Sequence, residues 1–253
     1  MSQIVQAVQQ RTDAVAKQRA HPPLWQALAL VGLLLWLYAP TLDHLARQWW
    51  HDPNFSHGFF VPLFSAFVIW QERAQLARLS LQPSWWGLFY LAFALCLLVV
   101  GQMGAELFLS RFSLVLALGS LTVLFLGWPF FRAILFPWAF LLLMIPIPAI
   151  VFNQITFPLQ LLASRLASGT LALLGVPVLR EGNVLILSTM ALEVAEACSG
   201  IRSLMSLATL AIIYGYLMER RVATRLLLAL AALPIAVVAN SLRIVGTGLL
   251  VQY

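Results

Sequence analysis

Reactive side chains are concentrated in one short stretch, residues 193–202, which opens a long apolar run. The stretch contains Glu193, Glu196, Cys198, Ser199 and Arg202. A cysteine at the start of a helix lies near the positive end of the helix dipole, and an arginine one turn later adds a second positive charge. Both effects favour the thiolate, so the pattern predicts that Cys198 is a nucleophile. The alternative is an unreactive cysteine, with Ser199 as a helix cap and Arg202 as an interfacial anchor.

A second polar group interrupts the last apolar run, where Asn240, Ser241 and Arg243 follow a series of aliphatic residues. Because a charge is costly in hydrocarbon, we expect Arg243 to face the helix bundle or to reach the membrane surface. On the same side as Cys198, it would donate hydrogen bonds to a tetrahedral intermediate or hold the thiolate in its charged form. The alternative is an anchor whose guanidinium extends to the lipid headgroups.

Three histidines, His44, His51 and His57, flank two tryptophans after the first apolar run. Their spacings of seven and six residues match no standard zinc pattern, and tryptophan is common at membrane interfaces in any case. We therefore expect neither a metal ion nor another cofactor. A histidine from this segment can still serve Cys198 as a base if the two lie on the same side of the membrane.

The elements that must position these residues are membrane-spanning helices. Of the 253 residues, 62% are hydrophobic and 9% are charged, against roughly 45–50% and 25% in soluble domains. Mean hydropathy is +0.91, and the charges are collected between long apolar runs. The sequence therefore predicts an all-α polytopic membrane protein. The net charge of +6 does not indicate nucleic-acid binding, because no polar face concentrates the basic residues.

Seven apolar segments are predicted to cross about 30 Å of hydrocarbon, some with help from flanking residues. They cover residues 24–42, 58–71, 85–101, 107–127, 132–147, 199–218 and 226–247. Pro146 and Pro148 close the fifth segment. Residues 150–175 carry polar side chains among their leucines and are predicted to form an amphipathic or re-entrant helix. Residues 178–187 and 191–195 predict a short extracytoplasmic hairpin, with a turn at Glu181-Gly182-Asn183.

The distribution of Lys and Arg predicts the orientation of these segments. With the N-terminus inside, nine basic residues fall on the inside and six on the outside or at its edge. A full crossing by residues 150–175 would move Arg220, Arg221 and Arg225 outside, so the positive-inside rule favours a helix that does not cross. Residues 1–23 are expected to be a cytoplasmic arm that is retained, and residues 24–253 a single transmembrane domain.

Three motifs resemble those of one known family. Residues 196–202 read Glu-Ala-Cys-Ser-Gly-Ile-Arg and residues 240–244 read Asn-Ser-Leu-Arg-Ile, which together are similar to the signature of the exosortase and archaeosortase family. Residues 52–58, Asp-Pro-Asn-Phe-Ser-His-Gly, with Val61, Pro62 and the basic turn at Arg73, resemble the N-terminal half of the same proteins. The resemblance covers most of the chain from about residue 30 onward.

This resemblance implies a membrane-embedded cysteine transpeptidase, analogous to sortase by convergence. Its substrates would be membrane-anchored proteins that carry a C-terminal Pro-Glu-Pro motif, a transmembrane helix and a basic tail, in a system linked to exopolysaccharide and outer-surface export. It would lie in the bacterial inner membrane, with its active site on the periplasmic side. Cys198 would form a thioester with the substrate, and Arg243 would assist as proton donor or oxyanion partner. Arg202, Glu196 and Asn240 would have supporting roles.

The family also has a third catalytic residue, usually histidine, in a segment after the arginine helix, whereas this sequence ends at Tyr253. Three alternatives follow: a truncated or divergent member, a protein in which His57 takes the place of that histidine, or an inactive chain. A further alternative is a non-catalytic membrane scaffold, or a transporter, for polysaccharide export. The transporter alternative is weaker, because the acidic residues lie at the ends of apolar segments rather than within them.

Overall fold

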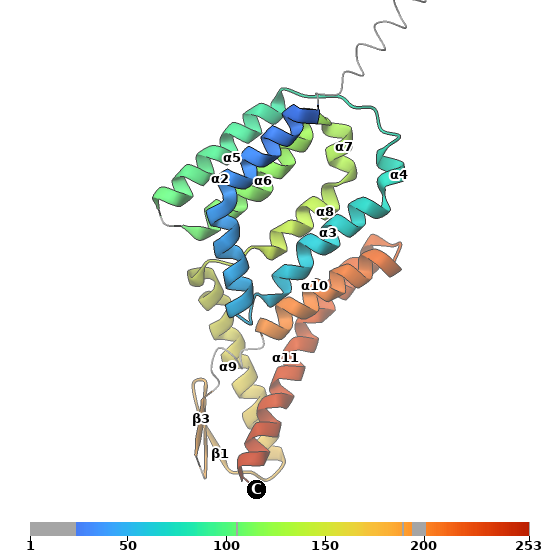
Figure 1. Ribbon diagram of the computed structural model, residues 1–253. Helices are drawn as coiled ribbons and strands as arrows, with labels where there is room; N and C mark the ends of the chain where they lie inside the picture. The colour runs from blue at the N-terminus through green and yellow to red at the C-terminus, as the bar shows by residue number, and fades with distance from the viewer. Residues whose placement is uncertain (1–23, 105, 189, 194–200, 253) are drawn as a thin grey trace, which may run out of the picture. The chain divides into compact units, whose positions relative to one another are not determined.

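The structure, a computed structural model, describes residues 24–104, 106–188, 190–193 and 201–252 and is predominantly helical (Figure 1). Within this part of the chain, five helices are long and apolar enough to cross a membrane: Ala29–His51, Trp86–Met103, Leu107–Phe125, Ile201–Met218 and Val222–Gln252. A sixth span results if the interrupted pair Leu135–Met144 and Ala149–Leu173 counts as one. The protein is therefore an α-helical, multi-pass membrane protein.

The predicted number of seven crossings is not confirmed, and the differences lie at two segments. The second segment forms a short 3-10 helix, η1 (Ser56–Phe59), followed by α3 (Phe60–Gln71). The 12 residues of α3 measure only about 18 Å, less than the thickness of the hydrocarbon core. The fifth segment is divided into α7 (Trp128–Ala133), α8 (Leu135–Phe140) and η2 (Leu141–Met144).

The chain forms two compact units. The first comprises residues 1–45 and 65–142, and the second comprises residues 46–64 and 143–253. The helix α2 (Leu24–His51) contributes to both.

In the first unit, the closest packing is between α5 (Trp86–Met103) and α6 (Leu107–Phe125), which lie side by side in Figure 1. Glycines permit this approach at both ends of the pair. A Cβ atom on Gly87 would overlap the backbone of Leu124, and one on Gly101 would lie 2.6 Å from the Ser110 hydroxyl oxygen. The short helix α4 (Arg73–Leu76) follows α3, and the segment after it returns along the end of α6.

In the second unit, a three-stranded antiparallel sheet packs against two long helices. The strands β1 (Val178–Glu181), β2 (Val184–Leu187) and β3 (Ala191–Glu193) lie in the order β1-β2-β3. The helices are α9 (Ala149–Leu173) and α11 (Val222–Gln252). Their shared core consists of buried aliphatic residues: Ala163, Ala167, Leu171, Val176, Leu185, Leu187, Ile244 and Val245.

Two local predictions are confirmed in this unit. Glu181 pairs with Val184 across the predicted turn, and Gly182 supplies the positive φ of 63° that the turn requires. The predicted break also occurs, since η2 ends at Met144 and α9 begins at Ala149, directly after Pro148. The predicted helix at residues 150–175 corresponds to α9, which ends at Leu173.

Candidate active site

The site begins with the loop between α2 and α3, which is held in place by Trp49. The indole N–H of Trp49 donates a hydrogen bond of 3.0 Å to the carbonyl oxygen of Met144. Gly58 lies directly against the indole, where a Cβ atom would overlap the ring. The turn itself is closed by the Asp52 carboxylate, which accepts a 2.9 Å hydrogen bond from the Asn54 N–H. These contacts give the loop a defined conformation.

Asn54 connects this loop to α10 (Ile201–Met218). Its side-chain oxygen accepts a hydrogen bond of 3.4 Å from Nε of Arg202, which lies in the first turn of α10 and is half-buried. The η1 helix also packs against α10. The two motifs that contain Asn54 and Arg202 are 148 residues apart in sequence and adjacent in this unit.

His57 belongs to the same loop and is the buried member of the three histidines. Its side chain is 7% exposed, whereas His44 and His51 are exposed. Among the described residues, nothing forms a hydrogen bond with Nδ1 of His57. Burial lowers the pKa of His57 below its usual value, and the backbone of Leu143 and Asn54 opposes this shift without cancelling it. The imidazole is therefore neutral at pH 7 and keeps one nitrogen available.

The helices α10 and α11 form an antiparallel pair that extends the site (Figure 1). Arg225 fixes the turn between them, because its Nε donates a 2.8 Å hydrogen bond to the Glu219 carbonyl and its guanidinium lies over the Tyr216 ring. Both helices rise 1.5 Å per residue, so equal lengths counted from this turn bring the start of α10 close to Asn240. For a straight helix pair, we therefore expect the first turn of α10 near the polar residues of α11.

The polar residues of α11 are divided between two faces of the helix. Asn240 is buried, with 5% of its surface exposed, and Ser241 is buried beside it. Arg243 is exposed. An exposed arginine on a membrane helix can either meet a ligand or extend toward the headgroups, which are the two alternatives that the sequence left open.

The predicted nucleophile Cys198 and its neighbour Glu196 lie outside the described residues. Arg202, Asn240 and His57 belong to the same unit, and Arg202 lies at the start of α10, which begins three residues after Cys198. Asn54 was not predicted as a site residue. Only its place in the Asp-Pro-Asn motif distinguished it, and nothing in the sequence indicated its contact with Arg202.

Taken together, the apolar helices define a multi-pass membrane protein with polar side chains at the start of α10. Comparison with protein families matches residues 49–253 to the family described as transmembrane exosortase. The match covers most of the chain, so this protein belongs to the exosortase family. No curated protein and no solved structure matches it. Membership supports a role as a membrane transpeptidase that sorts membrane-associated proteins.

Proposed function

We propose that this protein is a cysteine transpeptidase or protease of the bacterial inner membrane. Its substrates would be proteins with a C-terminal Pro-Glu-Pro motif, a transmembrane helix and a basic tail, in a pathway linked to exopolysaccharide and outer-surface export. The observation that carries this proposal is the contact between Asn54 and Arg202, which holds the loop with the buried His57 against the start of α10. That helix start follows the Cys198 motif, which resembles the exosortase signature.

The proposed reaction has two steps with a thioester between them. The Cys198 thiolate attacks the carbonyl carbon of the scissile peptide bond, and a C–S bond forms as the carbonyl oxygen becomes an oxyanion. The C–N bond then breaks, and the departing amine takes up a proton. In the second step, water or an acceptor amine attacks the thioester, which releases the product and restores the thiolate.

The charged and polar residues of the site are assigned by what each side chain can donate or accept. Arg243 has five N–H donors and would stabilise the oxyanion. Neutral His57 would take the proton from the thiol in the first step and return it to the leaving amine. Arg202 and Asn240 would act as positioning residues, Arg202 through Asn54. Glu196 is proposed as a further supporting residue on the strength of its motif alone.

The test is cleavage of a co-expressed reporter that ends in the Pro-Glu-Pro, transmembrane and basic-tail arrangement. We expect the intact protein to process the reporter and Cys198→Ala and Arg243→Ala to abolish processing at normal membrane levels. Cys96→Ala is the matched control, because it removes the other thiol, which lies exposed on α5 in the first unit. We expect it to retain full processing.

Two outcomes would contradict the proposal. Processing of the reporter by the Cys198→Ala variant would show that Cys198 is not required for the reaction. Absence of processing by the intact protein, at a normal level in the membrane, would favour a non-catalytic scaffold or a transporter. A covalent adduct between the intact protein and a thiol-reactive substrate analogue, absent from Cys198→Ala, would support the thioester step independently of turnover.

A further inference from the structure

The first unit contains an open pocket that has no part in the proposed reaction. It has a volume of about 1530 Å³ and is formed by the end of α3, by α4, by the segment that follows and by Phe130. Small-molecule sites usually measure about 300–1,000 Å³, so this pocket is large for a metabolite. We call it the basic pocket, because Arg73 and Arg78 line it and no acidic side chain is among the described residues of its lining.

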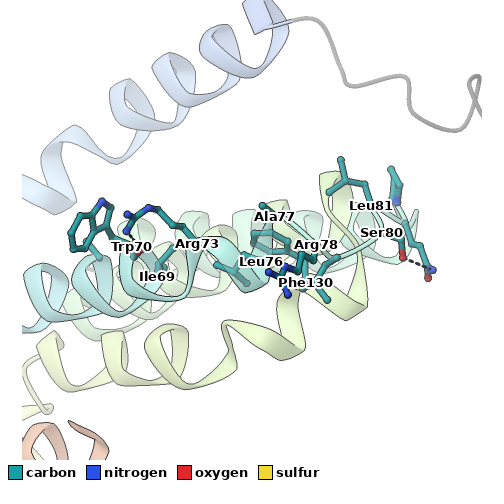
Figure 2. A pocket seen from close by; sticks show the side chains of 13 residues that line it. Ile69, Trp70, Arg73, Leu76, Ala77, Arg78, Ser80, Leu81 and Phe130 are labelled. Carbon is teal, nitrogen blue, oxygen red and sulfur yellow. Dashed lines mark hydrogen bonds between the residues drawn. The ribbon is translucent and has the colours of Figure 1, made fainter.

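The two arginines of the basic pocket have different surroundings. Arg73 is turned back toward α3, where Nη1 donates a 2.9 Å hydrogen bond to the Trp70 carbonyl and the guanidinium lies 4.3 Å from the centre of the Trp70 ring (Figure 2). This leaves four of its five N–H donors outside that bond. Arg78 is exposed, and Figure 2 shows it beside Leu76 and Phe130. The pocket lining therefore carries two positive charges together with several apolar side chains.

Tryptophan side chains indicate that the basic pocket lies at the membrane–water interface. The segment after α4 is bonded to the end of α6, through Gln82 N–H to Leu126 O at 3.2 Å. Trp85 and Trp86, at the start of α5, are 82% and 63% exposed, and Trp128 begins α7 close to the same ends. Exposed tryptophans at the ends of membrane helices mark the level of the lipid headgroups.

These observations indicate which kind of ligand the basic pocket would bind. Two guanidinium groups without an acidic partner in the pocket attract an anion, and guanidinium pairs well with phosphate. The pocket lining also includes the apolar side chains Leu76, Leu81 and Phe130, which a free phosphate ion would not use but which suit the acyl chains of a lipid. A basic peptide, such as the tail of a sorting signal, would be repelled by charges of the same sign.

We propose that the basic pocket binds the headgroup of an anionic phospholipid, with Arg73 and Arg78 as the partners of its phosphate and the apolar lining residues in contact with its acyl chains. By the predicted orientation, this lipid belongs to the cytoplasmic leaflet. The inference is independent of the transpeptidase chemistry, because none of the proposed site residues lines the pocket.

The experiment measures lipid binding to the full-length protein in neutral detergent. Short-chain phosphatidylglycerol is titrated and its apparent Kd is obtained from the thermal unfolding midpoint, with phosphatidylcholine of the same chain length and inorganic phosphate as separate titrants. We expect phosphatidylglycerol to stabilise the intact protein more than phosphatidylcholine or inorganic phosphate does. Each guanidinium near the surface adds about 1 kcal/mol of lipid attraction, so Arg73→Gln combined with Arg78→Gln should weaken binding roughly 30-fold.

The matched control is Arg220→Gln combined with Arg221→Gln, which removes the same charge from the exposed turn before α11. We expect this variant to bind phosphatidylglycerol within about twofold of the intact protein. If the double pocket variant does not fold, Arg78→Gln alone should weaken binding roughly fivefold, and because this side chain is exposed its replacement leaves no cavity.

The proposal is overturned by any of three results. Equal stabilisation by phosphatidylglycerol and phosphatidylcholine would mean that the headgroup charge is not recognised. Equal stabilisation by inorganic phosphate would identify an anion site rather than a lipid site. An equal loss in the Arg220 and Arg221 control would show that binding follows the net charge of the protein and not the pocket.

Discussion

Three properties of His57 keep its imidazole neutral and leave its Nδ1 without a hydrogen bond to the described residues. It is buried, its Nδ1 makes no hydrogen bond with the described residues, and its pKa is lowered by burial. His44 and His51 have the same chemistry but are exposed, and Nδ1 of His51 lies 2.8 Å from the Arg47 carbonyl. The sequence motif already favours His57 as the candidate, and its burial distinguishes it from the other two histidines.

The lowered pKa of His57 predicts a stability that depends on pH. In the unfolded chain the imidazole binds a proton near its ordinary pKa of 6.5, whereas the folded protein resists protonation. Stability is therefore fully present above pH 6.5 and falls as the pH drops below it, by at most about 1.4 kcal/mol per pH unit for one proton. Thermal unfolding in detergent between pH 8 and pH 5 measures this loss.

His57→Gln should reduce the pH dependence over this interval, and His51→Gln should leave it unchanged. Equal pH profiles for the intact protein and His57→Gln would show that His57 is not the group responsible. In the reporter assay, His57→Gln should also lower processing if His57 is the base, whereas a purely structural histidine would affect processing only through the protein level.

Arg111 is a second ionisable residue that is buried in the structure. It lies in α6 with 3% of its side chain exposed, and its Nε has no hydrogen-bond partner among the described residues. A buried charge without compensation destabilises a membrane helix. Arg111→Met should therefore raise the free energy of unfolding, on the order of 1–4 kcal/mol.

Arg132→Met is the control for this prediction, because Arg132 is exposed on α7 and its replacement should bring no comparable gain. Thermal unfolding of the purified variants measures both effects. If Arg111→Met is instead less stable than the intact protein, Arg111 has an anionic partner outside the described chain.

At the scale of single elements, the loop between α2 and α3 depends on one close approach. Gly58 lies against the Trp49 indole, and a Cβ atom there would overlap the ring. Gly58→Ala should displace Trp49 and break its hydrogen bond with Met144, at a cost of about 1–3 kcal/mol. The contact between Asn54 of this loop and Arg202 would then be lost, so reporter processing and the thermal unfolding midpoint should both fall.

Gly32→Ala is the matched control, because Gly32 is a helical glycine with no atom within 4 Å of the position that its Cβ would take. Alanine is the better helix former, so this change should leave stability equal or slightly higher. Unchanged processing by Gly58→Ala would show that the Asn54 contact with Arg202 does not depend on the loop conformation.

At the scale of the whole molecule, accessibility labelling tests the predicted orientation. Single cysteines can replace Arg73 and Glu181 in a background that lacks Cys96 and Cys198. We expect a membrane-impermeant thiol reagent to label Glu181→Cys in intact cells and to label Arg73→Cys only after the membrane is permeabilised, because the positive-inside rule places Arg73 in the cytoplasm. Labelling of Arg73→Cys from outside would reject the proposed orientation.

The same labelling addresses the short helix α3. Its 12 residues are too few for a regular span, but η1 precedes it and α4 follows closely. Cysteines at exposed positions on either side of α3, such as Ser56 and Gln75, should be labelled from opposite sides if the segment crosses as predicted. Labelling from one side would leave five or six crossings in the described part of the chain.

The sequence by itself determined the class of protein and its local breaks. Hydrophobicity adds up over a segment, so long apolar runs predict membrane helices whatever their neighbours are. The hairpin turn at residues 181–183 and the break before Ala149 depend on glycine and proline, whose backbone preferences act within a few residues. The family was recognisable because its motifs are contiguous stretches of sequence, and the family match confirms it.

Only the tertiary structure decided which of the candidate residues are buried or in contact. The contact of Asn54 with Arg202 joins residues 148 positions apart, and the burial of His57 and Arg111 depends on helices that pack against them. The basic pocket likewise combines α3, α4 and Phe130 from separate segments. Such arrangements depend on how the faces of different elements pack together. The pattern of residues within one segment does not predict which distant segments will contact it.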